Sequence, residues 1–127
     1  MQVQLAANDP AGVRAARRAT KQTVRAWAPR PGVTDDVCLV VSELVTNALL
    51  HGRSDAVLRV LRQDGSIRVE VQDEDTRLPL PSAPDQQALG GRGLALVAAL
   101  ATLWGTERTD SGKTVWAEFD LRERRGT

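Results

Sequence analysis

Three short stretches of the chain hold residue types that could do chemistry. The first is "SELVTNALLHG" at 42–52, where Glu43 and Asn47 lie four residues apart in a mostly apolar run. An amide oxygen such as that of Asn47 is a hard ligand suited to Mg²⁺. A carboxylate such as that of Glu43 can act as a base or orient a water molecule. A glutamate and an asparagine at this spacing, taken alone, are more often ordinary residues of a helix surface. The other two stretches therefore determine whether a functional site is indicated.

The second stretch, "VEVQDED", ends a predicted strand at Asp73, whose carboxylate can accept a hydrogen bond from an exocyclic amine. The third, "LGGRGL", opens a predicted helix with glycines, which let backbone N–H groups and the positive end of the helix dipole meet a phosphate. Between them, residues 76–89 hold three prolines and no sustained period. We expect that segment to be a functional loop, because long loops in compact domains usually are functional or disordered.

The elements that must position these residues begin with an amphipathic helix. Asp9 is a candidate N-cap and Pro10 suits the first helical position. One narrow stripe at helical spacing is apolar except for one threonine: Val13, Ala16, Thr20, Val24 and Trp27. A second stripe, here called the basic row, lies along its flank: Arg14, Arg17, Arg18, Lys21 and Arg25. Such a row is by default a solvated face, yet five cations without an acid exceed what solubility requires.

A second helix is predicted to begin at Thr34, whose hydroxyl can cap it, and to end between His51 and Gly52. Glu43, Asn47 and His51 border its apolar side, and Cys38 falls towards the core.

Beyond Gly52 the period changes from 3.6 to 2. "AVLRVLR" and "SIRVEVQ" flank an Asp-Gly turn, and "LWGTERT" and "KTVWAEFDL" flank a second turn, so each pair predicts an antiparallel hairpin. "LALVAALATLW" is apolar nearly all round and predicts a buried helix. The order of helix, helix, hairpin, loop, helix and hairpin predicts an α+β two-layer sandwich. We expect a single domain over 1–127, with a mainly antiparallel sheet carrying helices on one face.

Composition excludes several other classes of protein. With 17 basic and 16 acidic residues the net charge is +1, which does not favour direct binding of nucleic acid or membrane. A single cysteine excludes an internal disulfide, and no apolar run is long enough to span a bilayer. We therefore expect a soluble, cytoplasmic protein. The pair Gly112-Lys113 is not a P-loop, because the residues before it lack the required glycine spacing.

Taken together and in this order, the stretches resemble the Bergerat ATP-binding domain of gyrase-type ATPases and histidine kinases, and within it the anti-sigma-factor serine kinases. The family's N box, Glu-x-x-x-Asn, matches Glu43 and Asn47, and its second glycine box matches "GGRGLALV". The resemblance implies ATP and Mg²⁺ as cofactors, Glu43 as general base and Asn47 as metal ligand. It further implies that Asp73 binds the adenine amino group and that Thr114 lies beside the adenine. It places Gly91, Arg92, Gly93 and Leu94 against the phosphates.

One departure from the family pattern keeps two functions open. The family's first glycine box is Asp-x-Gly-x-Gly, whereas both glycines are absent after Asp73 here. The first function is a serine/threonine protein kinase that phosphorylates an anti-anti-sigma protein. The alternative is a catalytically degenerate module that sequesters a sigma factor or another regulator without ATP turnover. A homodimer is a further implication of the resemblance.

Overall fold

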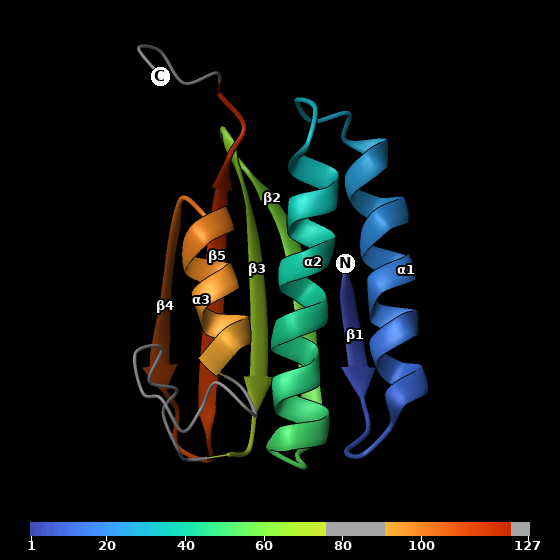
Figure 1. The fold of residues 1–127 in the computed structure, drawn as a ribbon, viewed down its shortest axis with the longest axis vertical. Coiled ribbons are helices and arrows are strands. Elements are labelled where there is room, and N and C mark those ends of the chain that lie inside the picture. Colours follow the sequence, from blue (N-terminus) through green and yellow to red (C-terminus); the bar gives the residue numbers. More distant parts are fainter. Residues whose placement is uncertain (76–90, 123–127) are drawn as a thin grey trace.

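The computed structural model of the protein describes residues 1–75 and 91–122, with backbone only at 91–93. Its strands form one antiparallel sheet in the order β1-β2-β3-β5-β4: β1 (Gln2–Leu5), β2 (Ala56–Gln63), β3 (Ser66–Asp73), β4 (Leu103–Arg108) and β5 (Lys113–Asp120). The helices are α1 (Pro10–Ala26), α2 (Val33–Thr46) with a π-helical extension η1 (Asn47–His51), and α3 (Gly91–Leu100). All of them cover the same face of the sheet (Figure 1). The predicted α+β class is confirmed, and the predicted loop at 76–89 lies outside the described residues.

Helix α1 begins as its sequence predicts. The Asp9 side chain accepts a hydrogen bond from Ala11 N at 3.0 Å and Pro10 is the first helical residue. Thr20, the one polar member of the apolar stripe, is fully buried, and its hydroxyl donates to Ala16 O at 2.7 Å. The hydroxyl is therefore satisfied within its own helix, so it does not penalise burial.

The start of α2 differs from the prediction. The N-cap is Gly32, in the left-handed region at φ 90°, and no side chain caps the helix. Thr34 lies inside the first turn, because the left-handed Gly32 starts the helix two residues before the predicted cap at Thr34. Asp35 and Asp36 occupy the first turn, where negative charge favours the helix dipole.

Strand β1 is an element that the sequence analysis did not predict. It pairs with β2 so that Gln2 lies opposite Arg59 and Leu5 opposite Ala56. Four residues, two of them glutamines, are too few to show an alternating pattern, so the pairing with β2 determines the strand. This edge strand extends the sheet beneath α1 (Figure 1).

Helix α3 is less enclosed than its composition suggests. Leu94 and Val97 are buried, whereas Ala95, Ala98 and Ala99 are exposed. The helix packs against α2 and the sheet with one side only, and the small alanine methyl groups are tolerated in water. The prediction of a helix buried all round is wrong on this point.

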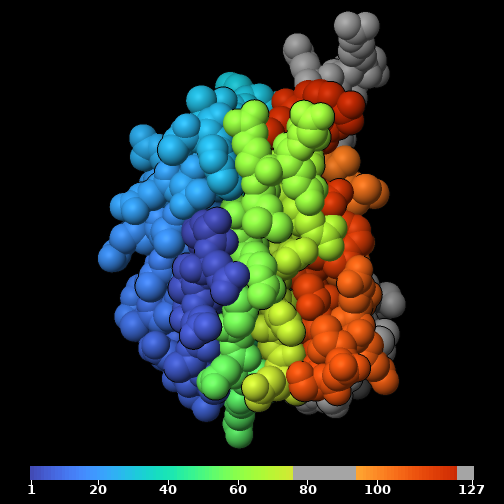
Figure 2. All heavy atoms as spheres, turned by 180° about the vertical axis from the view of Figure 1, so that it is seen from behind, coloured from blue at the N-terminus to red at the C-terminus, as the bar shows by residue number. Residues whose placement is uncertain are grey.

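The two predicted hairpins are present, and their inward residues form the floor of the core. None of the helices in the described part of the chain lies over the opposite face of the sheet (Figure 2). On that face Arg68 lies 4.5 Å above the Trp116 ring and forms ion pairs with Glu70 at 2.8 Å and Glu118 at 2.7 Å. Polar pairs of this kind let one face of an antiparallel sheet meet water. Among residues 1–75 and 91–122, no helix is both long and apolar enough to cross a membrane.

Candidate functional site

Helix α2 carries the predicted N-box pair into the middle of the helical layer. It lies between α1 and α3 (Figure 1), and its inward side is buried along its whole length: Val33, Val37, Val40, Val41, Leu44 and Val45. Glu43 and Asn47 are half-buried at the border of this side. The two side chains are separated by one helical turn, and Asn47 N donates to Glu43 O.

The helix widens at Asn47. Gly52 N donates to Asn47 O at 2.7 Å, five residues back, which makes η1 a π-helical turn. Two further bonds hold this turn in place, from Asn8 N to Leu49 O at 2.8 Å and from Ser54 N to Ala48 O at 3.0 Å. π turns occur frequently at functional sites, because they redirect side chains that a regular helix would align differently. The N-box asparagine therefore lies where regular helical geometry ends.

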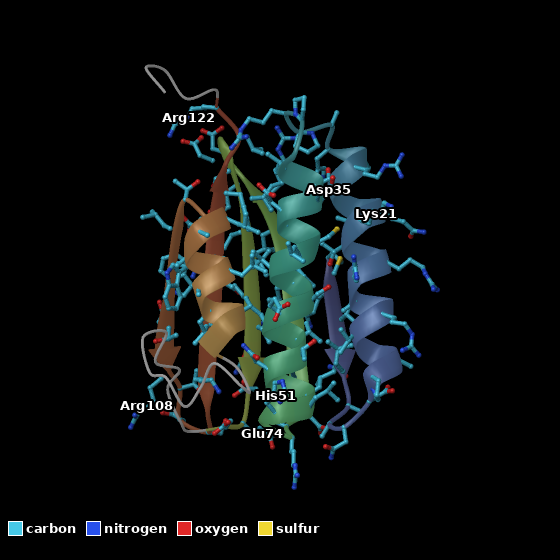
Figure 3. The ribbon with its side chains drawn as sticks, viewed as in Figure 1. Lys21, Asp35, His51, Glu74, Arg108 and Arg122 are labelled. Atoms are coloured by element: carbon cyan, nitrogen blue, oxygen red, sulfur yellow. The ribbon has the colours of Figure 1, made fainter. Side chains whose placement is uncertain are left out.

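The end of β3 lies against the end of η1. The backbone of Gly52 comes so close that a Cβ on it would be 3.1 Å from Asp75 Oδ2. Ser54 Oγ accepts a hydrogen bond from Glu74 N at 2.8 Å, which ties the segment after η1 to the end of β3. In Figure 3, His51 and Glu74 mark this common end of the molecule. The fold thus brings together the end of the N-box helix and the strand end that carries Asp73.

Asp73 is buried and its carboxylate is already in contact with a cation. Lys113 Nζ lies 3.1 Å from each carboxylate oxygen, and Asp75 N donates to Asp73 Oδ1 at 2.9 Å. Lys113 Nζ also donates to Asp75 O at 3.3 Å. Burial raises the pKa of the Asp73 carboxyl above its ordinary value, and the Lys113 ammonium opposes that rise.

The sheet separates Thr114 from this cluster. Residues 67, 69, 71 and 73 of β3 point towards the helices, and so do residues 113, 115, 117 and 119 of β5. Because successive side chains alternate between faces, Thr114 lies on the open face, opposite Gln72 in the register. Lys113 takes the inward position opposite Asp73. The structure therefore does not bring Thr114 and Asp73 to the same face of the sheet.

The second glycine box opens α3 as the sequence predicts. Gly91, Arg92 and Gly93 lie in its first turn, and Leu94 is 2% exposed, so it anchors that turn in the core. His51 is exposed at the end of η1. Within 1–75 and 91–122, no three His, Cys, Asp or Glu side chains are grouped as a metal site would require.

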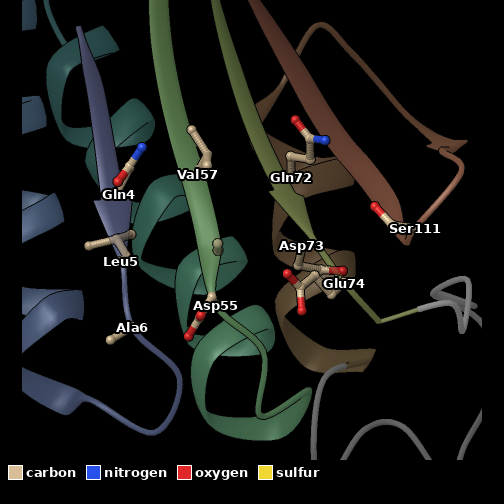
Figure 4. Close-up of a pocket in the computed structure, with 10 residues that line it drawn as sticks. Gln4, Leu5, Ala6, Asp55, Val57, Gln72, Asp73, Glu74 and Ser111 are labelled. Carbon is tan, nitrogen blue, oxygen red and sulfur yellow. The ribbon is translucent and has the colours of Figure 1, made fainter.

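A hollow of about 440 Å³ opens beside the end of β3 (Figure 4). Its lining comes from the ends of β1, β2 and β3 and from the turn before β5: Gln4, Leu5, Ala6, Asp55, Ala56, Val57, Gln72, Asp73, Glu74 and Ser111. The strand end that carries Asp73 therefore borders open space.

Lys113 is the residue of this cluster that the sequence analysis did not single out. The alternation along β5 is visible in the sequence, since Lys113 lies two and four residues before Val115 and Ala117, which point towards the helices. Asp73 likewise has the parity of Val71. What the alternation cannot supply is the register that places Asp73 opposite Lys113.

Comparison with known proteins agrees with the fold. The chain matches the model of the histidine kinase-like ATPase domain over residues 6–119. A search of curated proteins found no match. Among solved structures, the chain is similar to the RsbU and RsbW domains of Rv1364c from Mycobacterium tuberculosis, with a TM-score of 0.71 and 19% identity. That similarity covers 95% of this chain and 32% of the other, and at this identity it shows the fold alone.

The chain is also similar to the blue-light activated histidine kinase of Erythrobacter litoralis EL346 in two structures, each with a TM-score of 0.53 over 70% of this chain. Identity is 29% with its histidine kinase domain and 31% with the second structure, of which this chain covers 45% and 30% respectively. The chain thus spans less than half the length of each of these proteins. Because the family model covers most of the sequence, the chain belongs to the histidine kinase-like ATPase domain family.

Proposed function

We propose that the protein is an ATP-binding regulator of the anti-sigma-factor kinase type, which transfers a phosphoryl group to a serine or threonine hydroxyl of an anti-anti-sigma protein. The observation that carries this proposal is the position of Glu43 and Asn47. They lie one turn apart where α2 widens into η1, and η1 ends against the strand end that carries Asp73. This arrangement supports a site with a base and a metal ligand on one side and an acceptor for a purine amine on the other.

Each residue has a separate role in this proposal. The amide oxygen of Asn47 would hold Mg²⁺, a hard cation that would neutralise phosphate charge at this position. Glu43 accepts the proton of the attacking hydroxyl. The backbone at Gly91, Arg92, Gly93 and Leu94 faces the phosphates with the positive end of the α3 dipole. Bound ATP supplies the phosphoryl group. The chemistry of Asp73 suits an exocyclic amine, although its carboxylate is in contact with Lys113.

A second candidate function is a binding module that holds a sigma factor or another regulator without turning over ATP. Two observations favour it. Asp73 is 5% exposed, and its carboxylate is paired with a lysine instead of being open to a ligand. The glycines that the family has at positions 75 and 77 are aspartate and arginine here.

The kinase and the binding module would have the same partners, because both are regulators of the anti-sigma-factor type. We propose a sigma factor and an anti-anti-sigma protein in the cytoplasm, with a homodimer as the assembled form. The fold shared with the RsbU and RsbW domains supports a regulator of this type.

Calorimetric titration with ATP, with and without Mg²⁺, tests the proposal most directly. The kinase predicts saturable heat that depends on Mg²⁺, and transfer of label from γ-³²P-ATP to a serine-containing anti-anti-sigma protein. Binding without transfer would favour the binding module. A flat titration at millimolar ATP would contradict nucleotide binding itself.

A further inference from the structure

The ion pair between Asp73 and Lys113 lies on the face of the sheet that the helices cover, and water has little access to it. Only 3% of the Asp73 side chain and 10% of the Lys113 side chain are exposed. The ammonium is equidistant from the two carboxylate oxygens, at 3.1 Å, and a second aspartate, Asp75, has its Oδ2 3.8 Å from the same Nζ. One buried cation therefore serves two carboxylates.

The backbone around Lys113 is arranged to hold this contact. Residues 109–112 form a tight turn closed by a hydrogen bond from Thr109 N to Gly112 O at 2.9 Å. A Cβ on Gly112 would overlap Asp73 O and come within 2.6 Å of Glu74 Cα, so only a glycine lets the turn lie directly on the end of β3. The next residue, Lys113, then begins β5 directly opposite Asp73. The Gly112-Lys113 pair is not a P-loop, and its role here is to hold the lysine against the Asp73 carboxylate.

We infer that Lys113 is an internal competitor for the base-binding carboxylate, so that a nucleotide base can reach Asp73 only when the Lys113 ammonium leaves it. This inference rests on the nucleotide site proposed above, in which Asp73 receives an exocyclic amine. It assigns to Lys113 the control of nucleotide affinity at that site. Asp73 can be paired with Lys113 or bound to a nucleotide base, but not both at once.

The direction of the competition follows from charge. A hydrogen bond between an ammonium and a carboxylate is roughly twice as strong as one between neutral groups. The amine of a purine is neutral, so it cannot replace the charge that Lys113 contributes beside a buried carboxylate. The equilibrium therefore favours Lys113, and only the fraction of molecules with Asp73 released binds nucleotide. When the competent fraction is about a tenth or less, the apparent dissociation constant is raised about tenfold or more.

The first test compares matched lysine variants by calorimetry with ATP and with adenosine, which has no phosphates. Lys21 and Lys113 are the only lysines of the chain, and Lys21 is exposed on α1, so Lys21→Met is a control with the same chemical change. Lys113→Met keeps the length of the side chain but removes the competing charge. We expect it to bind both ligands about tenfold or more tightly than wild type, while Lys21→Met binds as wild type does. Circular dichroism checks that each variant is folded.

The second test uses the wild-type chain, in case Lys113→Met does not fold. Labelling lysine with ¹³C gives side-chain signals from two residues only. Titration with adenosine should move the Lys113 signal with the affinity that calorimetry gives and leave the Lys21 signal in place.

The outcomes separate this inference from the proposed function. Suppose that wild type binds ATP. The competition is then refuted if the Lys113 signal stays unchanged at saturation, or if folded Lys113→Met binds no more tightly than wild type. In both cases the proposal of nucleotide binding stands. If neither wild type nor Lys113→Met binds ATP or adenosine, both proposals fail.

Discussion

Glu43 and Asn47 lie one turn apart in α2 and η1, and their different chemistry lets single substitutions separate their roles. Asn47→Ala removes a neutral oxygen donor, so Mg²⁺-dependent ATP affinity should fall if that oxygen binds the metal. Glu43→Gln keeps shape and hydrogen bonding but removes basicity, so ATP binding should persist. Phosphotransfer should then drop by about 10²–10⁴-fold, the usual contribution of a general base. Calorimetry and transfer of labelled phosphate, both applied to both variants, measure the two effects.

Because both side chains are half-buried, a structural role is the competing explanation. If both variants lose their circular dichroism spectrum, the pair stabilises the helix and the catalytic assignment is unsupported. If Asn47→Ala binds Mg²⁺-ATP as wild type does, Asn47 is not a metal ligand.

Cys38 gives a prediction with a defined dependence on pH. Burial raises the pKa of its thiol above the ordinary value of a cysteine, against the opposing effect of Arg17. The folded state thus favours the protonated thiol, so this group's contribution to stability is complete below the unfolded pKa and is lost as pH rises through the folded pKa. At pH 8 we expect iodoacetamide to alkylate the folded protein at least about tenfold more slowly than the urea-unfolded protein. Equal rates would show that the thiol is accessible in the native state.

At the scale of elements, the sequence predicted what local chemistry determines. The Asp9 cap, the Asp-Gly turn and the two alternating patterns each act within a few residues, and α1 and the hairpins formed as expected. Strand β1 and the Gly32 cap were missed for different reasons. Strand β1 exists because β2 offers it hydrogen bonds, whereas Gly32 caps α2 through its left-handed backbone instead of a side chain.

The turn between β4 and β5 positions Lys113, and the substitution Gly112→Ala tests this role of the turn. The added methyl group must push the turn away from Asp73 and Glu74, which should cost about 1–3 kcal/mol of unfolding free energy, as overpacking does. The neighbouring Ser111 is exposed, so Ser111→Ala is the control and should change stability by less than about 0.5 kcal/mol. Urea unfolding measures both. Equal stability of the two variants would mean that the turn moves freely and does not position Lys113.

At the scale of the whole molecule, the candidate site is assembled from segments far apart in the chain. Glu43 and Asn47 come from the centre of the helical layer, and Asp73 and Lys113 from two strands that are neighbours in the sheet but 40 residues apart in the sequence. Sequence motifs predict Glu43, Asn47 and Asp73 as site residues from their types and spacing. The contact between Asp73 and Lys113 depends on the register of β3 with β5, which no local pattern encodes. The alternation of side chains along β5 leaves Thr114 on the other face.

The charges of the molecule are distributed unevenly over its surface. All five residues of the basic row are exposed on α1, and among residues 1–75 and 91–122 none of them forms an ion pair. Three of them, with Gln22 and Ala26, line a shallow hollow: Arg18, Lys21 and Arg25. Exposed cations along one helix can steer an acidic protein into place, although the net charge is only +1.

We therefore predict that the basic row is the docking surface for an acidic regulator. Reversing Arg14 and Arg18 to Glu should slow association at least about tenfold at low salt and barely change the melting temperature, because exposed charges contribute little to stability. The matched control reverses Arg108 and Arg122, which lie on the side of the molecule away from α1 (Figure 3) and give the same change in net charge. Stopped-flow association at 50 and 300 mM salt, with the anti-anti-sigma protein as partner, measures both variants. If the two double variants are slowed equally, net charge and not the basic row guides association; if neither is slowed, the row is only a solvated face.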